Sequence, residues 1–341
     1  MDDPSSRRAD GPVRGRYAPS PTGPIHLGNA RTALAAWLSC RAQGGTFVYR
    51  LEDLDAPRVV AGMATAQMDD LRWLGLDWEE GPDLAGPHAP YVQSARHKLY
   101  EAALDRLHRA ERLFPCRVSR RELRELASAP HGPSGLVPYP ASLRPTRLAT
   151  DWYAQFHDDP DPDAALRFRV GDGDVPFTDH VLGPQHQQVQ AAVGDFVLKR
   201  RDGVYAYQLA VVVDDLAMGV TEVVRGQDLL SSTARQIQLI EALGGEPPRY
   251  AHLPLVLDAE GRKVSKREAE AGLALTHLRE AGVQPEQVVG YLAYTLGLLE
   301  RPAATPPQAL IEGFDLGNLP ATPWRLPALP LAALQAVPPL R

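Results

Sequence analysis

Two segments of this chain carry residue types that could bind a nucleotide triphosphate. The first, RYAPSPTGPIHLGN at 16–29, joins a Pro- and Gly-rich turn to His26 and an Ala-rich helical pattern. The spacing predicts a strand over 13–17 and a helix over 27–37, so that His26 and Asn29 stand at a helix start. Free backbone N–H groups and the positive end of the helix dipole attract phosphate there, and Gly28 would let a ligand approach the backbone. Alone, such a histidine is more often a capping or solvated residue.

The second segment, GRKVSKR at 261–267, places Lys263 and Lys266 on either side of Ser265. It follows a predicted strand over 252–257 and a predicted turn over 258–261. Two lysines on a loop next to glycine can close over phosphates and neutralise the charge that develops during nucleotidyl transfer. The plain alternative is an exposed basic loop. Both segments in one chain, in this order, favour the functional interpretation.

The elements that must position these residues follow from periodicity and turn signals. Strands are predicted over 46–51, 165–170, 196–200 and 220–225, and helices over 59–74, 95–112, 228–243, 272–280 and 285–299. Strands alternating with helices predict an α/β fold with a parallel sheet, whose ligands lie at the carboxyl ends of the strands. From residue 114 to about 150 the pattern changes to short helical and Pro/Gly-rich pieces, which indicates an insertion.

These signals give an expected domain organisation. We expect a disordered tail over 1–12, the two halves of a catalytic domain over 13–113 and 195–267, an inserted α+β subdomain over 114–194, and a short helical, Pro-rich extension over 268–341.

The two motifs, PSPTGPIHLGN and KVSKR, resemble the signature motifs of class I aminoacyl-tRNA synthetases. The surrounding YRLEDLDAPR and AYQLAVVVDDLAMGVTEVVRGQDLL are similar to the glutamyl branch of that family, and the likeness extends over about 13–267. It implies a Rossmann-like catalytic domain that uses ATP, with Mg²⁺, to convert L-glutamate to glutamyl-adenylate. It assigns catalytic roles to His26, Lys263 and Lys266.

Glutamate carries two carboxylates and one ammonium, so a selective pocket needs two separated cations and one anion. Arg16, Arg225 and Glu52, each near the end of a predicted strand, supply that set. By resemblance, Arg16 meets the side-chain carboxylate, Arg225 the α-carboxylate and Glu52 the amino group. The full implied glutamate site is Arg16, Tyr17, Ala18, Pro19, Ser20, Glu52, Tyr207 and Arg225, and the implied ATP site is His26, Gly28, Asn29, Asp228 and Lys266. Tyr207 could equally be a core aromatic.

The acceptor of the glutamate is inferred from the length of the chain after the lysine motif. Residues 268–341 are too few for the large anticodon-binding region of a full glutamyl-tRNA synthetase. The chain therefore resembles the short paralogue of that branch, which activates glutamate without tRNA and attaches it to the queuosine base in the anticodon loop of tRNA(Asp). A truncated enzyme that charges a tRNA 3′ end, and a non-catalytic RNA-binding paralogue, are the alternatives.

Short paralogues often carry a zinc site built from C-x-C and Y-x-x-x-C. Here Cys116 and Tyr139 remain, but Val118 and Leu143 replace the other two ligands. One thiolate and one phenol cannot hold a tetrahedral zinc ion, so we expect no metal site and apolar packing in its place.

Composition agrees with a cytoplasmic enzyme. The net charge of −6 gives no overall bias toward nucleic acid, so RNA must be met by local basic groups, and we expect no DNA partner. Two cysteines argue against a disulfide framework, and no apolar run indicates a membrane partner.

Overall fold

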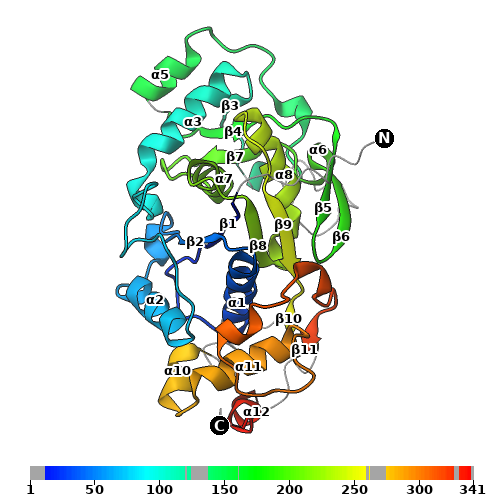
Figure 1. The fold of residues 1–341 in the computed structure, drawn as a ribbon. Coiled ribbons are helices and arrows are strands. Elements are labelled where there is room, and N and C mark those ends of the chain that lie inside the picture. Colours follow the sequence, from blue (N-terminus) through cyan, green and yellow to red (C-terminus); the bar gives the residue numbers. More distant parts are fainter. Residues whose placement is uncertain are drawn as a thin grey trace.

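The computed structural model describes residues 12–119, 121–123, 137–159, 161–258, 261, 274–325 and 330–338. It begins with β1 (Arg14–Tyr17), which runs through the Pro- and Gly-rich turn into α1 (Leu27–Ala42) (Figure 1). The Ala- and Leu-rich α1 is buried along most of its length and continues beyond the predicted end at Trp37. Gly44, with a φ of 62°, turns the chain toward the next strand.

Parallel strands form the centre of the molecule. β1 pairs with β2 (Thr46–Tyr49) in parallel, and β8 (Glu222–Gly226) pairs in parallel with β9 (Arg249–Leu253). The two pairs lie side by side, since the backbone N–H of Thr221 donates to the carbonyl of Arg14 at 3.0 Å. The carboxyl ends of these strands therefore gather on one edge, as the alternation of strands and helices predicted.

Helices surround this sheet and divide the apolar core in two (Figure 1). One core surrounds α1, and the other lies among α3 (His97–Arg109), α7 (Tyr207–Ala217) and α8 (Leu230–Ala242). The helix predicted over 59–74 is shorter: the 3₁₀ turn η2 (Ala56–Arg58) precedes it, and α2 (Met63–Trp73) starts after Gly62. The helix α7 had not been predicted.

The segment between the two halves of the parallel sheet contains antiparallel strands. β3 (Leu113–Cys116), β4 (Ala165–Phe168) and β7 (Phe196–Lys199) form one sheet, although the expected boundaries at 114 and 195 divide them. A hairpin of β5 (Asp174–Asp179) and β6 (Gly183–Gln188) was also not predicted. Its Asp179 pairs with Tyr250 of β9, so the hairpin touches the parallel sheet. The short helices α5 (Trp152–Asp158) and α6 (Val189–Ala192), and the 3₁₀ turns η3 (Gln93–Ala95) and η4 (Ala141–Leu143), complete the connections.

The C-terminal helices pack beneath α1 (Figure 1). They are α10 (Leu275–Glu280), α11 (Pro285–Thr295) and α12 (Pro330–Gln335). The strand predicted over 252–257 is broken: β9 ends at Leu253, and β10 (Val256–Leu257) pairs with β11 (Trp324–Arg325). The buried Arg31 of α1 fixes this region, since its guanidinium donates to the carbonyl of Pro254 and to Thr295, both at 3.1 Å.

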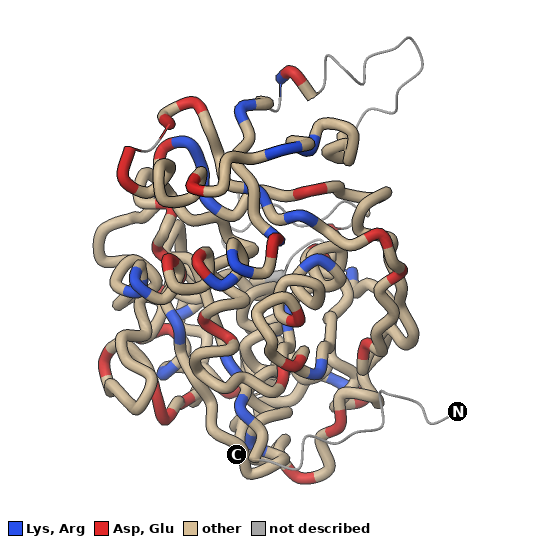
Figure 2. The backbone as a smooth tube through the Cα atoms, turned by 90° about the horizontal axis from the view of Figure 1, so that it is seen from above, with Lys and Arg blue, Asp and Glu red and all other residues tan. Residues whose placement is uncertain are grey.

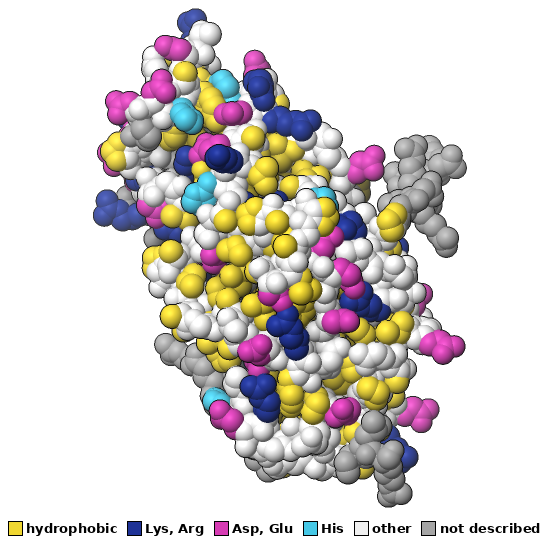
Figure 3. All heavy atoms as spheres, turned by 60° about the vertical axis from the view of Figure 1, so that its left-hand side comes forward, with side chains coloured by type: hydrophobic (Ala, Val, Ile, Leu, Met, Phe, Trp, Pro, Cys, Tyr) yellow, Lys and Arg dark blue, Asp and Glu magenta, His cyan; other side chains and the backbone are white. Residues whose placement is uncertain are grey.

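Charges of both signs are interspersed along the chain (Figure 2) and over the face drawn in Figure 3. Within the described ranges, no helix is long and apolar enough to cross a lipid bilayer.

Candidate functional site

A cavity of about 870 Å³ opens at the carboxyl ends of the parallel strands. All the sequence-predicted glutamate- and ATP-binding residues that the structure describes line it: Arg16, Tyr17, Ala18, Pro19, Ser20, His26, Gly28, Asn29, Glu52, Tyr207, Arg225 and Asp228. Lys263 and Lys266 lie outside the described residues. The chain that leads toward them, Leu253 to Val256, forms part of the cavity wall.

Arg16 keeps most of its hydrogen-bonding capacity for the cavity. It is 5% exposed, and among the described residues it donates only one hydrogen bond, from Nη1 to the carbonyl of Val224 at 3.1 Å. Its Nε lies 3.8 Å from Asp215 Oδ1. Burial lowers the pKa of Arg16, while the Asp215 carboxylate opposes that effect. The remaining N–H groups are suited to a carboxylate ligand.

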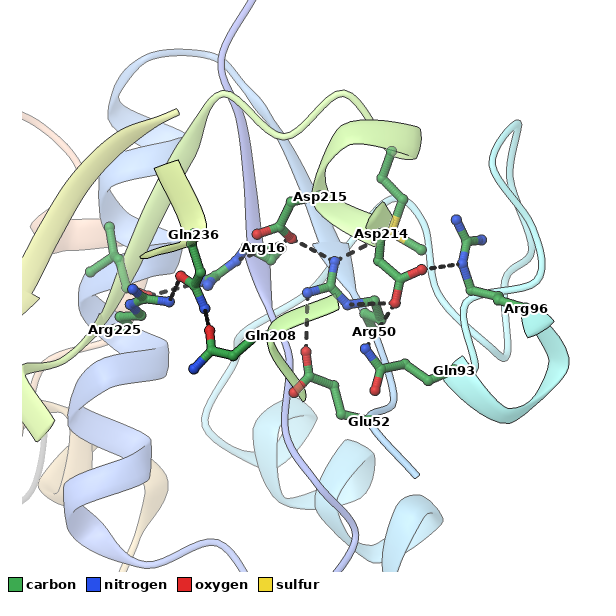
Figure 4. Close-up of polar contacts among 12 residues, drawn as sticks. Arg16, Arg50, Glu52, Gln93, Arg96, Gln208, Asp214, Asp215, Arg225 and Gln236 are labelled. Atoms are coloured by element: carbon green, nitrogen blue, oxygen red, sulfur yellow. Dashed lines mark hydrogen bonds and ion pairs between the residues drawn. The ribbon is translucent and has the colours of Figure 1, made fainter. Parts of the chain in front are cut away.

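Arg50, which the sequence analysis did not single out, organises the acidic groups beneath the cavity (Figure 4). It is fully buried, and its Nη1 lies 2.6 Å from Asp215 Oδ1 and its Nη2 3.1 Å from Glu52 Oε1. Asp214 lies 3.9 Å from its Nε and is held from the other side by Arg96 at 2.6 Å. Arg50 and Arg96 thus pair with these buried carboxylates below the site.

Glu52 supplies the anion of the predicted set. Burial raises the pKa of its carboxyl, and the neighbouring Arg50 opposes the rise. Its backbone N–H donates to the carbonyl of Pro19 at 3.0 Å, which ties the end of β2 to the turn after β1. A cationic ligand would compensate the buried carboxylate.

Arg225 is held more firmly than Arg16 (Figure 4). Its Nε donates to His252 Nε2 at 2.9 Å, its Nη1 to Gln236 Oε1 at 2.8 Å, and its Nη2 to Thr233 Oγ1 at 2.9 Å. Nη2 also lies 3.4 Å from the carbonyl of Leu229. A guanidinium has five N–H groups, so the described residues leave one, on Nη1, for a ligand.

His26 caps the start of α1, as the alternative in the sequence analysis allowed. Its Nδ1 accepts hydrogen bonds from the backbone N–H groups of Gly28 and Asn29, at 3.1 and 3.3 Å. The expectation that these N–H groups are free for phosphate is therefore wrong in this structure, because the imidazole caps them. Gly28 leaves room for that cap, since a Cβ there would lie 3.0 Å from His26 Cε1.

The turn between β1 and α1 has a support that sequence reasoning also missed. Gln67 of α2 donates to the carbonyls of Ser20 and Gly23, at 3.2 and 2.7 Å. Gln67 belongs to no motif in the sequence, so nothing there signalled this role. Ser20 is exposed on the turn, where Gln67 fixes the backbone.

Tyr207 and Asp228 line the mouth of the cavity. Tyr207 is 38% exposed, so the core-aromatic alternative for it is wrong. Asp228 stands in the 3₁₀ turn η5 (Gln227–Leu229) that follows β8. Both side chains can therefore meet a ligand that fills the cavity.

The segments compared with a zinc site form a small apolar cluster. Cys116 and Tyr139 are buried with Phe114, and Val118 and Leu143 pack against them, which confirms the predicted packing. Tyr139 Oη donates to the carbonyl of Leu143 at 2.8 Å. Among the residues that the structure describes, no group of His, Cys, Asp or Glu side chains comes together as a metal-ligand set.

The site therefore offers two guanidinium groups and one carboxylate beside a helix start. Residues 12–300 match the family described as tRNA synthetases class I (E and Q), catalytic domain, where E and Q are glutamate and glutamine. The chain belongs to this family. It is thus a ligase with the class I synthetase α/β fold, as the motifs indicated.

Named relatives align with this protein over nearly its whole length. It is 51% identical to a glutamyl-Q tRNA(Asp) synthetase of Symbiobacterium thermophilum, over 94% of this chain and 98% of that protein. It is 46% identical to a protein of the same name from Nitratidesulfovibrio vulgaris, over 93% and 96%. A crystal structure of a glutamate tRNA ligase from Elizabethkingia meningosepticum in complex with its amino acid superposes with a TM-score of 0.82 at 29% identity, over 95% of this chain and 69% of that one.

Proposed function

We propose that this class I synthetase activates L-glutamate with ATP, without tRNA, and transfers the glutamyl group to the queuosine base in the anticodon loop of tRNA(Asp). The activation step is proposed because Arg16, Arg225 and Glu52 line the same cavity. Two cations and one anion there match the three charges of glutamate.

Each charged group has a distinct part in binding glutamate. Arg16, with a single hydrogen bond to described protein atoms, takes the side-chain carboxylate through its free N–H groups. Arg225, fixed on three sides, presents one N–H to the α-carboxylate. Glu52 takes the ammonium, while Arg50 donates a hydrogen bond to its carboxylate. Tyr207 closes the open side.

The α-carboxylate of glutamate attacks the α-phosphorus of ATP, which gives glutamyl-adenylate and pyrophosphate. No side-chain nucleophile is required. The protein accelerates the reaction by positioning glutamate beside ATP and by stabilising the charge that develops on the phosphates. His26, at the start of α1, and Lys263 and Lys266 are the proposed groups for the phosphates, with Asn29 and Asp228 for the rest of the nucleotide. Mg²⁺ bound to ATP would supply charge neutralisation at the phosphates.

The proposed acceptor of the glutamyl group is supported by the comparisons with relatives. Relatives named glutamyl-Q tRNA(Asp) synthetase match nearly from end to end at 51% and 46% identity. The solved glutamate tRNA ligase is matched over 69% of its length at 29% identity. The modified base is therefore a better proposal than a 3′ ribose.

The test is to locate the label after incubation with radiolabelled glutamate and ATP. The substrates are tRNA(Asp) with queuosine, tRNA(Asp) without it, and tRNA(Glu). After nuclease digestion, label should remain with the queuosine nucleoside and be absent from unmodified tRNA(Asp). Label on the 3′-terminal adenosine of tRNA(Glu) would instead identify a truncated charging enzyme. Glutamate-dependent pyrophosphate exchange with no label on any RNA would contradict the transfer step alone.

A further inference from the structure

A buried chain of hydrogen bonds joins the β5–β6 hairpin to Arg225. Asp179, at the end of β5, lies with Oδ2 2.5 Å from Nδ1 of His252 in β9. His252 Nε2 accepts from Arg225 Nε at 2.9 Å. The three residues are 1%, 0% and 4% exposed, respectively. They come from three strands, and none of their contacts was visible in the sequence motifs.

Donor and acceptor types fix the protonation of His252. The Nε of an arginine can only donate, so His252 Nε2 must present its lone pair. An ionised Asp179 can only accept, so the single imidazole proton lies on Nδ1. A protonated imidazole would direct a second N–H at Arg225 and break the contact. His252 is therefore neutral and in one tautomer.

Surrounding charges agree with this state. Burial lowers the pKa of His252, and its hydrogen bond to Asp179 only partly offsets the effect. For Asp179, burial alone would raise the pKa, but hydrogen bonds from His252 and the backbone of Leu182 hold it below its usual range. Arg225, also stacked on the Tyr250 ring at 5.4 Å, is the cation that faces His252 from β8.

Asp179 is itself immobilised. Its Oδ1 accepts from the backbone N–H groups of Val181 and Leu182, at 3.0 and 2.9 Å, and from that of His252 at 3.2 Å. The carboxylate that orients the imidazole is thus fixed by the turn of the hairpin. This resembles the general arrangement in which a buried carboxylate holds a histidine in one tautomer.

We propose that His252, oriented by Asp179, is a positioning residue that fixes the guanidinium of Arg225 for the α-carboxylate of glutamate. This inference rests on the proposed function of Arg225. Gln236 and Thr233 hold the two terminal nitrogens, and His252 supplies the acceptor for Nε. With all three in place, the guanidinium cannot rotate, and its remaining N–H keeps one direction.

Two substitutions of His252 separate its bond to Asp179 from its contacts at Nε2, where Thr233 Oγ1 also lies, at 3.2 Å. In His252→Asn, the amide nitrogen can reach the position of Nδ1 and keep the bond to Asp179, but Arg225 Nε loses its acceptor. In His252→Gln, the amide oxygen can reach the position of Nε2 and accept from Arg225. Pyrophosphate exchange then gives KM for glutamate and for ATP in each variant.

We expect His252→Asn to raise the KM for glutamate roughly tenfold or more, because a charged donor loses its partner. The KM for ATP should stay within about twofold, and His252→Gln should restore the glutamate KM to within roughly threefold of the wild type. Equal KM values for glutamate in the wild type and the Asn variant would overturn the inference, as would a parallel rise in the KM for ATP.

A substrate analogue tests whether the effect passes through the α-carboxylate. Isoglutamine, the α-amide of glutamate, lacks that charge and should inhibit the wild type and His252→Asn equally. If His252→Asn weakened the binding of glutamate and of isoglutamine equally, His252 would have a merely structural role. Should His252→Asn not fold, Asp179→Asn provides the same comparison, since it frees the imidazole tautomer. If the wild type itself shows no glutamate-dependent exchange, the proposed function fails instead.

Discussion

Arg50 Nη1 lies 2.6 Å from Asp215 Oδ1 beneath the cavity, although the two residues are 165 positions apart in the chain. This ion pair joins β2 to α7 and sets the charge balance below Arg16 and Glu52. Arg50 also donates to Glu52 at 3.1 Å, so its role is to hold the acidic groups of the site in place.

Replacing Arg50 with Met should destabilise the protein by roughly 3–5 kcal/mol, because Asp215 and Glu52 would remain buried without their cation. Urea denaturation measures this change. The matched control is Arg58→Met, since Arg58 has a 68% exposed side chain and pairs with Asp55 at 3.5 Å. That control should shift stability by at most about 0.5 kcal/mol. Equal stability of the two variants would contradict the role of Arg50.

Arg16→Gln should raise the KM for glutamate roughly 100-fold, because a charged pair to the side-chain carboxylate is lost. Folding should change little, since Asp215 keeps Arg50 and Arg16 makes one hydrogen bond to described protein atoms. Arg16→Lys retains the positive charge but lacks the planar guanidinium. Its KM for glutamate should therefore lie between the values of the wild type and Arg16→Gln. A glutamate KM that is unchanged in Arg16→Gln, measured by pyrophosphate exchange, would remove Arg16 from the glutamate site.

Asp70 of α2 predicts a pH-dependent stability. It is 1% exposed, neither of its carboxylate oxygens has a hydrogen-bond partner among the described residues, and burial raises its pKa to about 6. The folded-state pKa therefore lies above the unfolded value of ~3.9. The folded protein binds this proton more tightly, so stability is lost as the pH rises from about 4 to about 6.

Asp70→Asn should accordingly raise the free energy of unfolding by roughly 2 kcal/mol at about pH 8 and change it little at about pH 4. Denaturation with urea at both pH values checks the difference. Asp69→Asn, at the exposed neighbouring position, should show no such dependence. A gain for Asp70→Asn that is the same at both pH values would contradict the account.

The cluster around Cys116 predicts that the purified protein holds no stoichiometric zinc. Val118 and Leu143 occupy this cluster with apolar side chains. Val118→Cys combined with Leu143→Cys would restore three thiolates beside Tyr139, and this variant should bind about one zinc ion per chain. Elemental analysis of both proteins after dialysis compares them. One equivalent of zinc in the wild type would show that the prediction is wrong.

Much of the cavity could be predicted from sequence because its residues stand at the ends of local elements. The turn after β1 and the start of α1 follow from Pro and Gly positions and an Ala-rich pattern, which are short-range signals. Arg16, Glu52 and Arg225 each lie at or near the end of a strand, and parallel strands bring such ends together.

The parts that were missed depend on contacts distant in sequence. Nothing local links Arg50 to Asp215, or Asp179 to His252. The helix α7 was missed because its run of three valines, Val211 to Val213, favours a strand by propensity, while burial between α3 and α8 stabilises a helix. The capping role of His26 was only an alternative in the sequence, because a motif does not specify side-chain orientation.

The most direct test of the central claim is ATP–pyrophosphate exchange by the wild-type protein with L-glutamate and Mg²⁺, in the absence of tRNA. Glutamine serves as the competing amino acid, because it lacks the second carboxylate, and Lys266→Ala serves as the variant with impaired phosphate contacts. The account predicts exchange with glutamate, much weaker exchange with glutamine, and a large loss in Lys266→Ala. Absence of exchange with glutamate, or equal exchange with glutamine, would contradict it.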